Sequence, residues 1–249
     1  MKHTALALLA SSLFNSAALA QQAQTPAPDE KVEEVKVTGT KDPEFKTYKP
    51  FILGLDAFEK YRQLAPAAPL RFILRTLDPK VTYEGVTMRI AGNEESLAVP
   101  VASDGTFSMP RNEALAKEDA EIILNRKKGT FRWRPSIYTP GLPNNVRRLG
   151  DLRLECEVRW AVERPDLPFL IRTTFSALGG PCNSARVRVM QVSPRELAAV
   201  YLVNGSKREM VDKKMLEEKN RGYWAPLHDK EHWPDDTLIE LEFANKQEN

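Results

Sequence analysis

The stretch Gly150-Asp-Leu-Arg-Leu-Glu-Cys-Glu-Val-Arg-Trp-Ala-Val-Glu163 has the most regular pattern in this sequence. Apolar residues occupy every even position from 152 to 162, and charged residues fill most of the odd positions between them. A period of two is typical of a strand that is buried on one face. We therefore expect a long strand of an antiparallel sheet here, with its charged side chains in solvent.

Shorter segments on both sides of this stretch also alternate or are rich in β-formers. Strands are expected at 70–77, 81–91, 96–102, 106–109, 119–126, 130–136, 184–192, 198–203, 206–211 and 237–243, and helices at 50–64, 112–118, 167–178 and 212–220. Many short strands without a βαβ rhythm predict a mainly β protein, as an antiparallel β-sandwich or a partly open barrel. The strands form one or two modules, with a possible join at the loop 138–149.

Three glycine turns punctuate these strands, namely Gly92-Asn93, Asp104-Gly105 and Asn204-Gly205, and such dipeptides favour tight hairpins. The stretch Val99-Pro-Val-Ala-Ser-Asp-Gly-Thr-Phe-Ser-Met-Pro110 resembles a hairpin of carboxypeptidase-regulatory-like and prealbumin-like β-sandwiches, where an Asp-Gly turn precedes Phe-x-Leu-Pro. The resemblance implies a sandwich and says nothing about chemistry.

Residues 1–20 have the features of a secretory signal peptide. Lys2 and His3 precede an apolar stretch, and Ala18-Leu19-Ala20 supplies small residues for cleavage after Ala20. No Cys follows that would make a lipoprotein, and no later segment has the length of a transmembrane helix. We expect a periplasmic or secreted protein with no transmembrane segment in its mature chain.

Residues 21–46 are rich in Gln, Pro, Ala, Glu and Lys, so a disordered tether is expected before a folded region at 47–245. Within the tether, Val32-Glu-Glu-Val-Lys-Val-Thr-Gly-Thr40 resembles the N-terminal segment of TonB-dependent outer-membrane receptors, which pairs with the energy-coupling protein. The resemblance implies such a partner; a β-prone stretch without any partner is the alternative.

The charge balance excludes one class of partner. Lys and Arg number 36 and Asp and Glu 34, so the net charge is only +2. A nucleic-acid-binding domain usually carries a large basic excess, and export would remove most nucleic-acid partners. We therefore expect no nucleic acid as a partner.

The two cysteines, Cys156 and Cys182, are predicted to form a disulfide, because exported thiols are usually oxidised. Three histidines are present, and His228 and His232 are spaced to share a metal on a helix, with Glu231, Asp235 or Asp236 as a third ligand. Asp229 stands where the zinc-protease motif has its Glu, so a polar surface turn is the alternative.

Two groups of basic and aromatic residues are candidate ligand surfaces: Arg132, Trp133 and Arg134 in the first, and Tyr223, Trp224 and Trp233 in the second. Such interleaving occurs on surfaces that bind polymers. In a half-buried strand the same alternation buries Phe131 and Trp133 and leaves the two arginines in solvent.

The sequence contains no nucleophile elbow, phosphate loop or dinucleotide motif, so it predicts no catalytic residue and no cofactor. The leading hypothesis is a non-enzymatic periplasmic β-sandwich that binds or scaffolds an envelope protein or polymer. One alternative is a metal-dependent envelope polymer hydrolase that uses His228 and His232. Another is an accessory protein of a TonB-coupled outer-membrane system.

Overall fold

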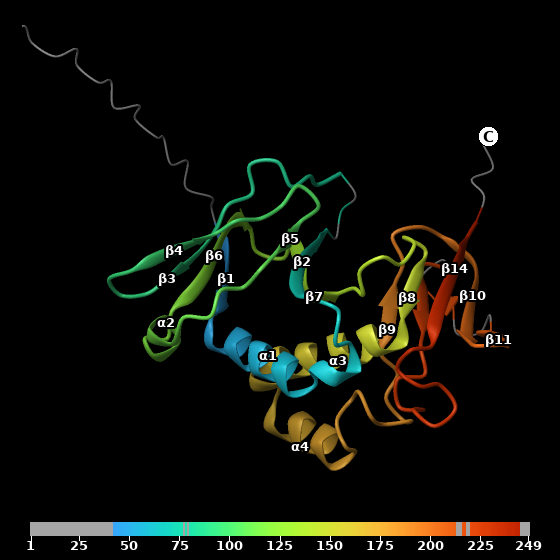
Figure 1. Ribbon diagram of the computed structural model, residues 1–249. Helices are drawn as coiled ribbons and strands as arrows, with labels where there is room; N and C mark the ends of the chain where they lie inside the picture. Colours follow the sequence, from blue (N-terminus) through green and yellow to red (C-terminus); the bar gives the residue numbers. More distant parts are fainter. Residues whose placement is uncertain (1–41, 77, 79, 213–215, 218–219, 245–249) are drawn as a thin grey trace, which may run out of the picture. The chain divides into compact units, whose positions relative to one another are not determined.

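The computed structural model describes residues 42–76, 78, 80–212, 216–217 and 220–244 of the chain, and these residues fold mainly into antiparallel β-sheets with a few short helices (Figure 1). The expected class, a β-sandwich with a few helices, is confirmed. Within this part of the chain, no helix has the length and apolar character needed to cross a membrane. The predicted signal peptide and the segment Val32–Thr40 lie outside the described residues.

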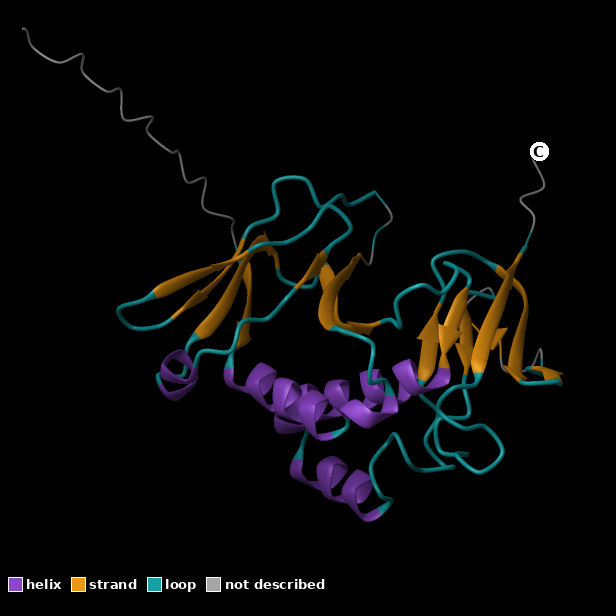
Figure 2. Ribbon diagram, viewed as in Figure 1, coloured by secondary structure: helices purple, strands orange, loops and turns teal. Residues whose placement is uncertain are grey.

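The N-terminal half contains two sheets (Figure 2). One has the strand order β1 (Pro43–Thr47), β6 (Glu121–Lys127), β3 (Met88–Ala91) and β4 (Ser96–Val99), and the other β5 (Thr106–Phe107), β2 (Leu70–Thr76) and β7 (Phe131–Ile137). The inward side chains of both sheets join one hydrophobic cluster. Its members include Met88, Ile90, Val99, Ile122 and Leu124 from the first sheet and Phe72, Leu74, Phe107, Phe131 and Trp133 from the second.

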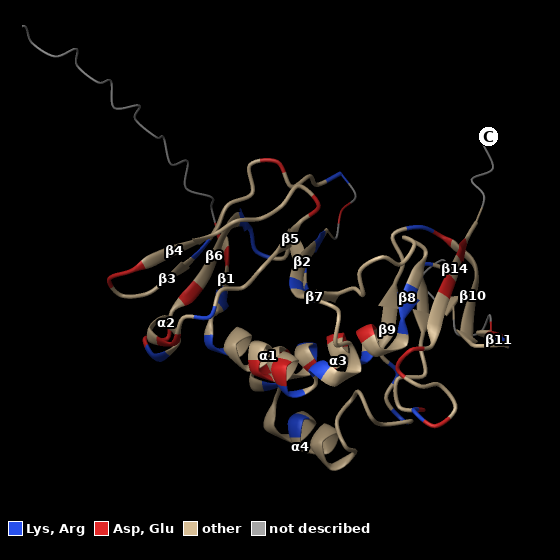
Figure 3. Cartoon of the chain, viewed as in Figure 1, with Lys and Arg blue, Asp and Glu red and all other residues tan. Residues whose placement is uncertain are grey.

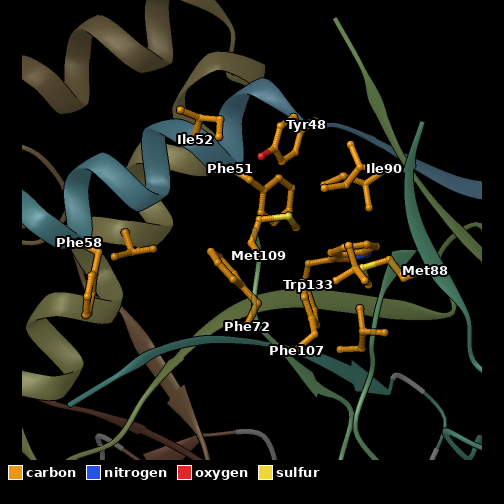
Figure 4. Close-up of a cluster of buried hydrophobic side chains, with 14 of the residues drawn as sticks. Tyr48, Phe51, Ile52, Phe58, Phe72, Met88, Ile90, Phe107, Met109 and Trp133 are labelled. Carbon is orange, nitrogen blue, oxygen red and sulfur yellow. The ribbon is translucent and has the colours of Figure 1, made fainter. Parts of the chain in front are cut away.

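Helix α1 (Lys49–Lys60) adds its apolar stripe to this core through Phe51, Ile52 and Phe58. Figure 4 shows Phe51, Phe72, Phe107 and Trp133 lying close together, and their ring centroids are 5.3 to 5.8 Å apart. Edge-to-face and offset pairs at this spacing each add about 0.5–1.5 kcal/mol beyond their burial. The short helix α2 (Glu113–Lys117) begins at Asn112, whose side chain accepts a hydrogen bond from the Leu115 N–H.

The C-terminal half also contains two sheets. One has the order β11 (Lys207–Met210), β10 (Leu197–Asn204), β14 (Leu238–Phe243) and β8 (Val146–Arg148), and the other β12 (Leu216–Glu217), β13 (Gly222–Trp224) and β9 (Met190–Val192). A second hydrophobic cluster forms here, with members such as Leu197, Val200, Tyr223, Trp233 and Ile239. The expected hairpin at Asn204-Gly205 is present, with Asn204 opposite Lys207.

The stretch expected to be a long strand is instead the helix α3 (Leu149–Glu163), so that prediction is wrong. Every residue from Leu149 to Val158 is buried, the charged ones included. The helix contributes Leu154 and Val158 to the first cluster, and Leu149, Leu152 and Cys156 to the second. Because both sides of the helix are covered, its polar residues do not face solvent as the strand pattern required.

Each buried charged side chain of α3 has a specific partner, which offsets the cost of its burial. Arg153 donates to the carbonyls of Leu227 and Trp233 at 2.8 and 2.7 Å and to Asp235 Oδ1 at 2.6 Å. Glu155 accepts from Ile137 N–H at 2.8 Å and from Arg147 at 3.0 Å.

The remaining two buried acids of α3 each bind a segment outside the helix. Asp151 accepts from the backbone and hydroxyl of Thr139, and Glu157 accepts from Asn183. Figure 3 shows the acidic and basic positions along α3. The helix therefore fixes the loops around it through its charges as well as through its apolar residues.

The fold also differs from the expectations in further places, among them the following. The ordered sheet begins at Pro43, inside the expected tether, because β1 pairs with β6. The Asp104-Gly105 turn is closed by a bond from Ala102 N–H to Thr106 O, but it joins strands of two different sheets, since β4 pairs with β3 and β5 pairs with β2. Within the expected helix 212–220, Leu216 and Glu217 form the strand β12.

Candidate functional site

A cleft of about 220 Å³ lies where β1, α1, β7 and the C-terminal end of α3 meet. Its walls combine apolar and basic groups. The lining residues are Lys46, Thr47, Pro50, Phe51, Phe72, Phe131, Arg132, Trp133, Arg134, Pro135, Arg159, Val162, Glu163 and Asp166. Three of them, Arg132, Trp133 and Arg134, belong to the first candidate ligand surface of the sequence.

The apolar wall of the cleft is rigid because its aromatic rings also belong to the core. Phe51, Phe72 and Trp133 are at most 9% exposed. The Trp133 indole N–H donates to Glu44 Oε1 at 2.7 Å, which fixes the plane of the ring. The alternation in β7 therefore does bury Phe131 and Trp133, as the strand reading of this segment predicted.

The basic wall centres on one carboxylate that two arginines share. Arg134 Nη1 lies 3.0 Å from Glu163 Oε1, and Arg159 Nε lies 3.0 Å from both oxygens of Glu163. Arg134 also donates to the carbonyl of Trp133 at 2.7 Å. Two guanidinium groups are thus held side by side at the cleft, with a single carboxylate between them.

The pKa of Arg134 is lowered mainly by burial and partly by neighbouring positive charge. Burial, together with the nearby Arg159, Arg132 and Arg75, lowers this pKa to about 10, and Glu163 opposes them. Arg134 still carries its charge at neutral pH, because the pKa remains well above 7. The charged form of Arg134 is therefore disfavoured first by burial and then by its cationic neighbours, and an added anion would favour that charged form.

More cationic than acidic side chains line the cleft, which favours binding of an anion. Four cationic side chains, Lys46, Arg132, Arg134 and Arg159, stand against two acids, Glu163 and Asp166. Arg132 is exposed at the rim. Paired guanidinium groups recognise carboxylates and phosphates through bidentate hydrogen bonds. The arrangement suits an acidic group on a small apolar body.

The size of the cleft limits what it can enclose. Pockets that bury a drug-sized ligand typically measure about 300–1,000 Å³, and this cleft is smaller. It would hold one acidic terminus or one ring of a larger molecule, whose remainder would lie outside.

The candidate metal residues do not converge in the structure. His232 Nδ1 lies 2.9 Å from Asp229 Oδ1, and Asp235 is engaged by Arg153. Within the described ranges, no group of three or more His, Cys, Asp or Glu side chains is placed to hold a metal ion. His228 and His232 are both exposed in a segment of turns, which is the geometry of the polar surface turn that was the alternative.

The second candidate ligand surface belongs largely to the C-terminal core. Tyr223 and Trp233 are 2% and 6% exposed, and burial raises the pKa of Tyr223. Trp224 is half-buried, and Arg188 lies over its ring at 4.8 Å. The structure therefore brings Arg132, Trp133 and Arg134 to a cleft and spreads Tyr223, Trp224 and Trp233 over a different part of the fold.

The sequence did not single out Arg159 and Glu163 as site residues. Both were placed on the solvent face of a strand, whereas α3 brings them beside Arg134. Their separation of four residues was the available signal, because an Arg and a Glu four positions apart pair on a helix.

The predicted disulfide is confirmed, with Cys156 bonded to Cys182. Comparisons with known protein families, with curated proteins and with solved structures found no match to this chain.

Proposed function

We propose that this protein is an exported, non-enzymatic binding module that holds an acidic group of an envelope component in the cleft between β7 and α3. The observation that carries the proposal is the pair Arg134 and Arg159, which share the single carboxylate of Glu163 beside a wall of fixed aromatic rings. The envelope component is a polymer or protein whose acidic terminus enters the cleft.

The cleft supports binding better than catalysis. Its central charged groups, Arg134, Arg159 and Glu163, are held in ion pairs, and arginine does not exchange protons near neutral pH. General acid–base catalysis needs a group that titrates near the working pH. Export is supported by the signal-peptide features of residues 1–20 and by the Cys156–Cys182 disulfide, since disulfides persist in oxidising compartments.

The test uses phenylacetate and phenyl phosphate as probes, with benzyl alcohol as the uncharged comparison. We expect the two anions to shift the NMR signals of the Arg134 and Arg159 side-chain N–H groups, while benzyl alcohol leaves them in place. A Kd in the millimolar range, about 4 kcal/mol of binding, is expected for such small probes.

Matched variants separate the cleft from general charge effects. Arg159→Gln should weaken anion binding about tenfold, and Glu163→Gln should strengthen it, because the competing carboxylate is neutralised. Arg208→Gln removes an exposed arginine that pairs with Glu240 and should change nothing. Equal affinity for the anions in all four proteins, or no shift at about 10 mM probe, would reject the proposal.

A further inference from the structure

Helix α4 (Phe169–Ala177) carries the two most exposed large apolar side chains of the described chain, Phe169 and Leu170. Phe169, Leu170 and Ile171 are 71%, 75% and 45% exposed, and no residue of the helix is buried. Other large exposed hydrophobic residues of the described chain are single and scattered, and single ones need no explanation. Three in a row at the start of one helix do need one.

Two links attach the helix to α3 in this exposed position. Its Phe175 ring makes an edge contact with Trp160 of α3, with 5.6 Å between centroids. The Cys156–Cys182 disulfide ties the segment that follows α4 to the same helix. The apolar tip is therefore presented on a fixed support rather than on a loose loop.

The hydroxyl groups of α4 are bonded within the helix itself. Thr173 donates to the carbonyls of Phe169 and Leu170, Thr174 to that of Leu170, and Ser176 to that of Arg172. A hydroxyl that is bonded to its own helix loses little when the helix leaves water for an apolar medium. The polar residues of α4 thus do not oppose contact with lipid.

The segment of the sequence that contains α4 is basic. Residues 164–188 contain Arg164, Arg172, Arg186 and Arg188 against the single acid Asp166. Arg172 lies in α4 itself, with its guanidinium 5.8 Å from the Phe169 ring, and Arg164 lies in the short 3₁₀ helix just before it. Exposed apolar residues flanked by arginines match the two parts of an anionic membrane surface, its acyl boundary and its headgroups.

We infer that the tip of α4 docks on an anionic phospholipid surface, with Phe169, Leu170 and Ile171 in the acyl boundary and Arg164 and Arg172 at the headgroups. A second copy of the chain fits less well, because three exposed side chains offer a few hundred Å² at most. A stable protein pair buries about 800 Å² on each partner. A membrane surface needs no complementary protein surface, and a small group of apolar side chains is enough to insert into it.

The experiment measures sedimentation of the protein, purified after export, with vesicles of phosphatidylglycerol and phosphatidylethanolamine or of phosphatidylcholine alone. We expect binding to the anionic vesicles that falls as salt is raised. The double variant Phe169→Ser with Leu170→Ser should lower the partition coefficient by about tenfold or more. The double variant Arg164→Gln with Arg172→Gln should reduce the preference for anionic vesicles several-fold.

Met210→Ser is the control, because Met210 is 54% exposed on β11, away from α4, and should leave vesicle binding unchanged. Circular dichroism checks that each variant is folded. Absence of binding to anionic vesicles, or binding that the α4 variants do not weaken, would overturn the inference. So would concentration-dependent dimerisation that the α4 variants abolish while no vesicle binding occurs. None of these outcomes depends on the cleft. A failure of vesicle binding would therefore not contradict the proposed anion binding, which is tested separately.

Discussion

Trp133 Nε1 lies 2.7 Å from Glu44 Oε1, and this hydrogen bond joins one wall of the cleft to the edge strand β1, 89 residues earlier in the chain. Glu44 is only 4% exposed, and its other oxygen accepts from the Gly129 N–H at 3.2 Å. One buried carboxylate therefore satisfies two donors from a strand and a turn that are distant in sequence.

The first prediction concerns Glu44. Replacement by Ala removes the acceptor and leaves a buried indole N–H and a backbone N–H without a partner, so we expect a loss of about 1–3 kcal/mol in the free energy of unfolding. Urea unfolding measures it. Glu242→Ala, at a side chain 53% exposed, should change stability little; equal effects of the two substitutions would contradict the prediction.

Arg153 is the next test, because it is 2% exposed and binds the carbonyls of the 226–235 segment. Arg153→Met keeps most of the volume but removes every donor to the carbonyls of this segment, and a buried acceptor left without a partner costs about 1–3 kcal/mol. We expect the urea midpoint to fall accordingly, with weaker protection of this segment in hydrogen exchange. A midpoint within error of the wild type would show that the carbonyls find other donors.

Reduction of the Cys156–Cys182 disulfide should destabilise the protein by about 3.5 kcal/mol, from the chain entropy of a loop with a sequence separation of 26. The comparison is urea unfolding with and without reductant, alongside Cys182→Ser. Limited proteolysis of the reduced protein should first cut between Arg164 and Arg188, since α4 then loses its covalent tie to α3. Two free thiols in the denatured, unreduced protein would contradict the prediction of export as well.

A pH dependence follows from Glu157. Burial raises the pKa of this carboxyl, and a hydrogen bond from Asn183 lowers it in part. Because the folded-state pKa lies above the ordinary value, the folded protein is favoured while Glu157 is protonated, and this contribution is lost as the pH rises through the raised pKa. Glu157→Gln, which keeps the acceptor for Asn183, should therefore stabilise the protein at pH 7 more than at pH 4. Urea midpoints at both pH values test this, and a loss of stability at pH 7 would refute it.

The sheet-rich class could be predicted from the sequence because most strands alternate and end at turns, as β10 and β11 do on either side of Gly205. The central helix could not be predicted from alternation. In α3 both sides of the helix are covered, so Arg153 and Glu155 are buried together with Leu152 and Leu154. The alternation of apolar and charged residues therefore carried no information about which side chains are exposed. The composition was the better guide, since Leu, Glu, Arg and Ala all favour helices.

Only part of the candidate site could be predicted from the sequence, because α3 was expected to be a strand. Arg132, Trp133 and Arg134 stand in one strand, and their alternation indicated which side chains reach the surface. Arg159 and Glu163 join them only through tertiary packing of a helix that the pattern assigned to a sheet. Lys46 was expected to lie in a tether, yet it follows Glu44 in an ordered strand.

Helix α3 also limits where the chain can be cut into two fragments that each keep a complete core. Its Leu154 and Val158 complete one core, while Leu149, Leu152 and Cys156 complete the other. A gene fragment that ends before residue 149 would encode the first half without Leu154 and Val158, and a fragment that begins after residue 163 would encode the second half without Leu149, Leu152 and Cys156. A cut in the loop 138–145 would therefore leave one of the two cores incomplete, although the sheets of each half look self-contained.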